Sequence, residues 1–187
     1  NITSEDGASE NLLKLPTPIR ETPRAITVIG PEQIREQNFR NLNEVIGFVP
    51  NMQAFGYRSA GDNFMARGYR MGQDDIRQDG FAGVVVSGGF APSMFGIEQV
   101  VALNGPAGLL YGQSVAPGGL LNLVSKKPRE ASMTRIDVRT GGFMGNGVRL
   151  VDRPSINVDF DSTGPIDKNG RFAYRALATL ENQNYFT

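Results

Sequence analysis

Residues 105–128 read GPAGLLYGQSVAPGGLLNLVSKKP, and this stretch carries the most distinctive pattern in the chain. Its glycines permit tight turns and close backbone approach, and its prolines fix the local backbone direction. We expect Gly119–Ser125 to form a strand and Pro106–Tyr111 to form one helical turn between this strand and the preceding one. The stretch therefore predicts a compact domain that is rich in loops.

The residues before this stretch alternate short apolar runs with turn residues. Residues 1–24 are polar and contain three prolines, which favours an extended arm. Ala25–Gly30 predicts a strand, and Pro31 then opens a helix, because proline suits a first helical position. Apolar residues recur at helical spacing over Asn41–Val49, which predicts a second helix. Short strands are predicted at Phe64–Tyr69, Asp75–Asp79 and Ile97–Leu103, and a loop at 81–96.

The pattern of apolar and polar residues changes after Pro128. In Met133–Gly141, Ser155–Thr163 and Arg171–Asn182, apolar residues occupy one face and mostly polar or charged residues the other. Segments of roughly ten residues with this alternation are typical of outer-membrane barrel strands. A soluble antiparallel sheet with one wet face gives the same pattern and is commoner, so alternation alone favours the soluble sheet. The short polar turn Gly164–Gly170 suits both structures.

Composition excludes several classes of function. Nineteen basic residues balance nineteen acidic ones, so the net charge gives no case for nucleic-acid binding. The chain has no cysteine and no histidine, which removes zinc fingers, iron–sulfur clusters, Ser-His-Asp triads and most transition-metal sites. No apolar run approaches the roughly 18 residues of a transmembrane helix. We expect neither a metal site nor a cofactor of the protein's own.

Two short patterns look like functional motifs and fail on inspection. Gly112–Ser114 begins like a nucleophile elbow, but Ala116 stands where glycine is required and no histidine can act as base. A hydrolase built on Ser114 would lose its activity in Ser114→Ala. Asp75 and Asp79 half-match a calcium loop that lacks its final glutamate, and solvated loop carboxylates are the simpler interpretation. We therefore expect no enzymatic activity and no catalytic residue.

The 105–128 stretch resembles the plug signature of TonB-dependent siderophore receptors. That family shows the pattern GP-x-x-x-LYG-x-x-x-PGG-x-x-N-x-x-(S/T)-K-(R/K)-P, which this chain follows apart from one inserted residue in a loop. The matching signature positions are Gly105, Pro106, Tyr111, Gly112, Pro117, Gly118, Gly119, Asn122, Lys126 and Pro128.

Shorter matches flank the signature in the order that the family shows. Asn104 is a departure, because the family usually has arginine before the GP pair, and a charge that seats the plug in relatives is therefore missing. The flanking matches are Glu21–Ile29 to the first plug strand, Leu42–Pro50 to a plug helix, Ala66–Tyr69 with Arg67 and Gly68 to an xRG(F/Y) strand, Gln78–Gly80 to a DG turn, and Ile97–Val100 to an ERVE-like strand.

The resemblance implies an α+β plug domain, with a small mixed sheet, short helices and many loops, followed by the first antiparallel strands of a transmembrane β-barrel. It places an extended arm at 1–24, the plug at 25–130 and barrel strands at 131–187. Three strands cannot close a barrel, and unpaired strand edges are not tolerated in lipid, so we expect further strands outside this chain. The implied location is the cell outer membrane, with the plug inside the barrel and facing the periplasm.

The resemblance also implies import of ferric siderophores, with TonB and its inner-membrane complex supplying energy and outer-membrane lipid surrounding the barrel. A siderophore brings the iron's ligands with it, so aromatic and hydrogen-bonding groups suffice for binding. No convincing TonB box occurs in residues 1–24. The alternatives are a receptor for another nutrient, such as a cobalamin or a glycan, and a plug-like soluble binding module. The residues carried over as ligand contacts are Tyr57, Arg58, Gly72, Gln73 and Phe90, and those expected to pair with the barrel wall are Arg67, Lys126, Lys127 and Arg129.

Overall fold

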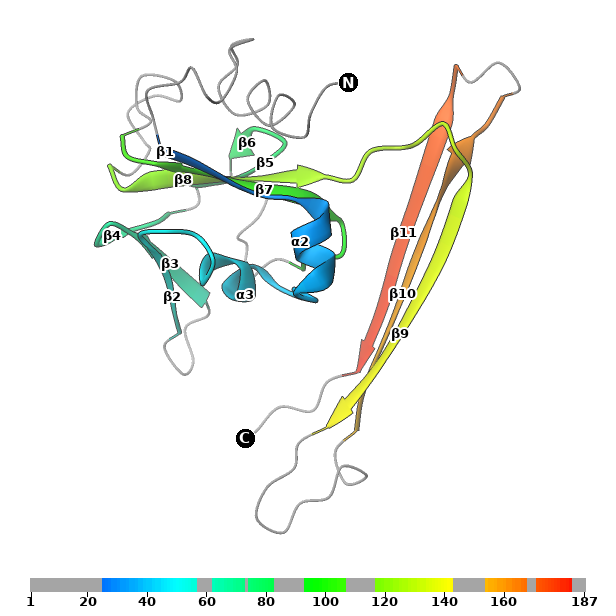
Figure 1. Cartoon of the computed structure of the whole chain (residues 1–187), viewed down its shortest axis with the longest axis horizontal. Helices are drawn as coiled ribbons and strands as arrows, with labels where there is room; N and C mark the ends of the chain where they lie inside the picture. The colour runs from blue at the N-terminus through cyan, green and yellow to red at the C-terminus, as the bar shows by residue number, and fades with distance from the viewer. Residues whose placement is uncertain are drawn as a thin grey trace. The chain divides into compact units, whose positions relative to one another are not determined.

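The chain forms two compact units, Asn1–Lys126 and Lys127–Thr187, in the computed structural model (Figure 1). Neither helix in the described ranges could span a membrane, since both are only one or two turns long. The predicted arm at 1–24, most of the predicted loop at 81–96 and all of the predicted helical turn except Pro106 lie outside the described residues. The structure describes residues 25–56, 62–72, 74–82, 93–106, 117–142, 154–167 and 171–182.

The first unit is built on a five-stranded mixed sheet in the order β1–β7–β8–β5–β6 (Figure 1). The β5–β8 pair is parallel, and the other pairs are antiparallel. The predicted strands before and after the GP pair are confirmed, whereas the start of the predicted 81–96 loop is a strand. The bounds are β1 Ala25–Ile29, β5 Ile76–Gln78, β6 Phe81–Ala82, β7 Ile97–Asn104 and β8 Gly119–Ser125.

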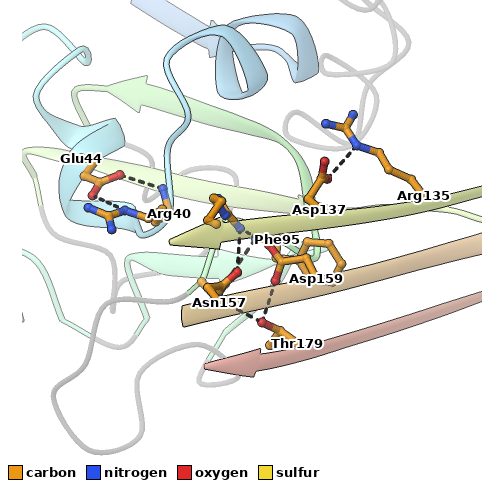
Figure 2. Close-up of polar contacts among 10 residues, drawn as sticks. Arg40, Glu44, Phe95, Arg135, Asp137, Asn157, Asp159 and Thr179 are labelled. Carbon is orange, nitrogen blue, oxygen red and sulfur yellow. Dashed lines mark hydrogen bonds and ion pairs between the residues drawn. The ribbon is translucent and has the colours of Figure 1, made fainter. Parts of the chain in front are cut away.

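Two short helices, α2 (Pro31–Glu36) and α3 (Leu42–Ile46), confirm the helix predictions. The Asn41 side chain caps α3 by accepting a hydrogen bond from Glu44 N at 3.2 Å. Glu44 in turn accepts from the backbone N–H of Arg40 at 2.7 Å and pairs with its guanidinium at 3.5 Å (Figure 2). The second helix ends three residues before the predicted end, because the chain continues as single turns before Pro50.

A second sheet of the first unit contains β2 (Met52–Gly56), β3 (Asp62–Ala66) and β4 (Tyr69–Arg70). The prediction of one strand over Phe64–Tyr69 was wrong. The chain reverses between β3 and β4, and Arg67 and Gly68 both have positive φ angles, 50° and 82°. Positive φ at both central residues defines the type I′ turn, whose twist matches that of paired strands. The short apolar runs on either side are therefore two strands of one hairpin.

The core of the first unit lies on both faces of the central sheet. On one face, Leu42, Val45 and Ile46 from α3 pack with residues of β2, β3 and the central strands. On the opposite face, the smaller cluster consists of four buried side chains from β7 and β8 with Ile26 and Val28 beside them. Because both faces are buried, β7 and β8 contain consecutive apolar residues, such as Val100–Leu103 and Leu120–Leu121, instead of a strict alternation.

The second unit is a three-stranded antiparallel sheet, ordered β11–β10–β9, whose long curved strands run side by side in Figure 1. The bounds are β9 Met133–Gly142, β10 Pro154–Pro165 and β11 Ala173–Asn182, so all three alternating segments are confirmed as strands. The register places Val158 opposite both Val138 and Leu180. This alignment makes the apolar face continuous across the strands, and Val138 on it is 63% exposed.

Candidate functional site

Two glycines of the signature stretch, Gly105 after β7 and Gly118 before β8, are joined by a backbone hydrogen bond. The Gly105 N–H donates to the Gly118 carbonyl at 3.0 Å and so joins the two ends of the intervening segment. A Cβ atom on Gly118 would overlap the Ala66 carbonyl group, with only 2.9 Å to its carbon. Gly105 itself has a φ of 108°, which side chains rarely permit. These glycines allow three segments to pack through their backbones.

The Arg67–Gly68 turn lies at this same junction. The Arg67 backbone N–H donates to the Asn51 carbonyl at 2.9 Å, and its Nη1 lies 3.5 Å from the position that a Cβ on Gly105 would occupy. The arginine is exposed, and its guanidinium has no ion pair within the described ranges. The side chain therefore lies beside Gly105, and its pairing with a barrel wall stays a prediction.

The signature asparagine, Asn122, holds the turn between β5 and β6. Asn122 is 1% exposed, and its Oδ1 accepts a hydrogen bond from Gly80 N at 2.9 Å. Asp79 Oδ1 accepts from Ser125 N at 2.9 Å, and the Asp79 N–H donates to the Leu123 carbonyl at the same distance. Asp79 and Gly80 both have positive φ angles, so this is a second type I′ turn. The signature asparagine thus has a structural role.

Buried charges support this turn and the loop before it. Arg77, which sequence reasoning did not single out, donates from Nε to the Asp74 carbonyl and from Nη1 to the Gly80 carbonyl, both at 3.2 Å. Asp75 Oδ2 accepts from Gly72 N at 2.6 Å. The aspartate considered for a calcium loop is therefore occupied in bracing backbone. An Asp-Gly pair that follows a short run is the sequence signal for such a turn.

Most of the candidate ligand contacts lie outside the described residues. Gly72 is exposed and precedes the braced Asp75. Pro106, Pro117 and Pro128 are also exposed. The predicted site residues that lie outside the described residues are Tyr57, Arg58, Gln73, Phe90, Tyr111 and Gly112.

Lys126 closes the first unit through both backbone and side chain. Its N–H donates to the Gly96 carbonyl at 3.0 Å. Its ammonium lies 4.8 Å from the centroid of the Phe95 ring, a cation–π contact. The lysine of the signature is therefore anchored within the first unit.

The polar face of the second unit carries buried ion pairs. Arg175 and Asp161 form a bidentate pair with N–O distances of 2.9 and 2.7 Å, and both side chains are only 5% exposed. Asp159 pairs with Arg139. The Oδ1 atom of Asp159 also accepts a hydrogen bond from Thr179 Oγ1 at 2.6 Å (Figure 2). Charges out of water require such partners. The sequence identified this face but not its pairs.

Two further hydrogen bonds connect this face with the residues before β9. Arg175 Nη1 donates to the Lys127 carbonyl at 2.8 Å. Thr163 Oγ1 accepts from the Arg129 backbone N–H and donates to the Tyr174 carbonyl, both at 2.8 Å. The start of the second unit is thus bonded to β10 and β11. Among the described residues, no cluster of three acidic side chains could hold a metal ion.

Comparison with known proteins identifies the class to which this fold and these signature contacts belong. Residues 18–120 match the family model of the TonB-dependent Receptor Plug Domain, and the chain belongs to that family. The expected fold class is confirmed: a plug domain with a mixed sheet and short helices, followed by initial barrel strands.

Particular relatives are siderophore receptors. The chain is 29% identical over 174 residues to the ferrioxamine B receptor of Salmonella typhimurium, covering 87% of this chain and 22% of the relative. It is 35% identical over 124 residues to the catecholate siderophore receptor Fiu of Escherichia coli, covering 64% and 16%. Both are receptors, which confirms the expectation that the chain is not an enzyme.

A solved structure shows the same fold. It is the ferripyoverdine receptor of the outer membrane of Pseudomonas aeruginosa bound to ferripyoverdine, and it superposes with a TM-score of 0.77 at 23% identity. The match covers 93% of this chain and 22% of that receptor. The chain thus spans about a fifth of the length of these two receptors, the ferrioxamine and ferripyoverdine receptors.

Proposed function

We propose that the complete protein is an outer-membrane receptor that imports ferric siderophores, with this plug gating the lumen and TonB supplying the energy. The observation that carries the proposal is the joining of a plug domain to strands with one apolar and one charged face. The named relatives receive ferrioxamine B, catecholate siderophores and ferripyoverdine, and they support this class of cargo.

The two faces of the second unit suit a barrel wall. The apolar face, with Ile136 and Val138 each 63% exposed, matches the surface that barrel strands present to lipid. The opposite face carries the ion pairs Asp161–Arg175 and Asp159–Arg139, and such a polar face suits a barrel lumen. A soluble sheet would instead cover its apolar face with another layer. We infer an outer-membrane location.

The cargo supplies its own iron chemistry. We propose that the protein has no resident cofactor and that iron arrives already chelated, which agrees with a chain that has no histidine or cysteine. The plug would then contact the chelate through aromatic and hydrogen-bonding groups. The proposed contacts are Tyr57, Arg58, Gly72, Gln73 and Phe90.

Titration calorimetry on the complete protein tests the cargo. We expect binding of at least one ferric hydroxamate, catecholate or pyoverdine-type chelate, and binding weakened at least tenfold by Arg58→Ala. Arg40→Ala, which removes only the guanidinium that pairs with Glu44, is the matched control and should leave binding unchanged. Binding of a cobalamin or an oligosaccharide and of none of the ferric chelates would replace the proposed cargo.

A transport assay tests the coupling. In cells that lack their own siderophore receptors, the complete protein should support uptake of the bound iron chelate only when TonB is present. Equal uptake in cells without TonB would contradict the energising step while leaving the binding result in place.

A further inference from the structure

The chain passes from the first unit to the second between two anchored residues. Lys126 is bonded within the first unit, to the Gly96 carbonyl and over the Phe95 ring. Lys127 is bonded within the second unit, through its carbonyl to Arg175. A residue bonded within the first unit is therefore followed directly by a residue bonded within the second.

The anchor in the second unit is a buried polar group. Arg175 donates from Nε and Nη2 to the two carboxylate oxygens of Asp161, and this bidentate contact fixes the orientation of the planar guanidinium. Its remaining nitrogen, Nη1, donates to the Lys127 carbonyl and not to a strand. Arg175 therefore bonds the segment that precedes β9 as well as its partner within the sheet.

Two residues after Lys127, a second hydrogen bond joins the backbone before β9 to a side chain of the sheet. Thr163 Oγ1 accepts from the Arg129 N–H, and its own hydroxyl proton goes to the Tyr174 carbonyl. Pro128 lies between the two bonded residues, where its ring fixes φ and holds the preceding residue extended. The connector Lys127–Arg129 is thus bonded at both ends and stiffened in the middle.

We propose that Arg175, Asp161 and Thr163 form a clamp that holds the connector Lys127–Arg129 on strands β10 and β11, so that the plug's attachment to the barrel has a fixed end. The link to plug movement rests on the proposed import function, whereas the clamp itself does not. During import the plug would then rearrange on the Lys126 side, and the connector would stay on the wall. The clamp acts on two backbone groups of the connector, the Lys127 carbonyl and the Arg129 N–H.

Hydrogen exchange on the complete protein in detergent tests the clamp, because the Arg129 amide is itself one of the clamped groups. Thr163→Val keeps the branched shape and removes the hydroxyl, and Arg175→Lys keeps the charge and removes the fork. Both should accelerate exchange of the Arg129 amide at least tenfold, with β9–β11 amides protected as before. Arg171→Ala is the matched control, since Arg171 pairs with Asp167 in the same hairpin.

A spin label at exposed Glu130 gives a second readout, because its mobility should rise in Thr163→Val and Arg175→Lys but not in Arg171→Ala. Unchanged Arg129 exchange in both clamp variants would overturn the proposal, as would equal acceleration of Arg129 and of the strand amides, which marks general loosening. Neither measurement needs a siderophore. A wild-type protein with a protected Arg129 amide that binds no ferric chelate would retain the clamp and lose the proposed function.

Discussion

At Gly118 the shape of one residue decides whether two backbone segments can meet. The Ala66 carbonyl occupies the space that a side chain would need, so any residue with a Cβ atom must displace backbone. The sequence alone could show that glycines occur here and that turns or close approach were needed. It could not show which carbonyl Gly118 contacts, because Ala66 is remote in the sequence and meets it only through the fold.

We expect Gly118→Ala to destabilise the central sheet of the first unit by about 3 kcal/mol, since backbone must move to admit the methyl group. The free energy of opening can be measured by hydrogen exchange of the Leu121 amide, which donates to the Asp75 carbonyl. Gly47→Ala is the control, because Gly47 has helical angles and a nearest contact of 3.6 Å. Equal protection in the two variants would show that the contact at Ala66 can relax.

Among the elements, the two type I′ turns show what sequence patterns can and cannot predict. Asp79-Gly80 is a strong hairpin signal, and its assignment as a turn was confirmed. Arg67-Gly68 adopts the same angles, but an arginine with positive φ is uncommon, so the segment looked like a continuous strand. The strand β2 was not predicted, because its sequence shows no strong alternation of apolar and polar residues. It is defined instead by its pairing with β3.

The buried pairs of the second unit were missed for a related reason. Alternation places Asp161 and Arg175 on the same face, but only the register decides which charges meet. The structure pairs Thr163 with Arg175, so the long arginine reaches Asp161 diagonally. Register depends on the turn that joins two strands, and the sequence of 164–170 predicted a short polar turn without fixing which residues of the two strands are paired.

For the β5–β6 turn, we expect Asn122→Ala to leave the Gly80 N–H without its partner. An unsatisfied buried donor costs about 1–3 kcal/mol, so the turn should open more often. Exchange of the Gly80 amide should accelerate by one to two orders of magnitude, roughly the equivalent of that free energy. Gln78→Ala, which removes only a side-chain bond to Ser125 Oγ, should leave the Gly80 amide protected, and acceleration by both variants would contradict a specific role for Asn122.

For the molecule as a whole, the separation of faces in the second unit determines which surroundings it tolerates. Most apolar side chains of β9, β10 and β11, among them Ile136, Val138 and Leu180, share one side, and the ion pairs occupy the other. This separation was predictable from period-two alternation. Whether the apolar face meets lipid or a second protein layer was not predictable, because alternation is the same in both cases, and the lipid-facing assignment is part of the proposed function.

We expect Val138→Arg to destabilise the complete protein in lipid vesicles by about 2–4 kcal/mol, because a charge would face hydrocarbon near the bilayer midplane. Leu177→Arg, on the polar face opposite Asp161, is the matched control and should cost much less. The folded fraction can be followed by heat-modifiable gel mobility across a urea series. If the two variants unfolded at the same urea concentration, the apolar face of the sheet would not be the lipid-facing one.

The peptide bond between Lys126 and Lys127 also has a consequence for recombining receptors. Lys126 keeps its bonds within the first unit, and Lys127 and Arg129 keep theirs within the second. A crossover between these two codons would therefore transfer each set of anchoring contacts intact to a chimera. We expect this peptide bond to be a suitable crossover point for chimeras that combine the plug of one receptor with the barrel of another.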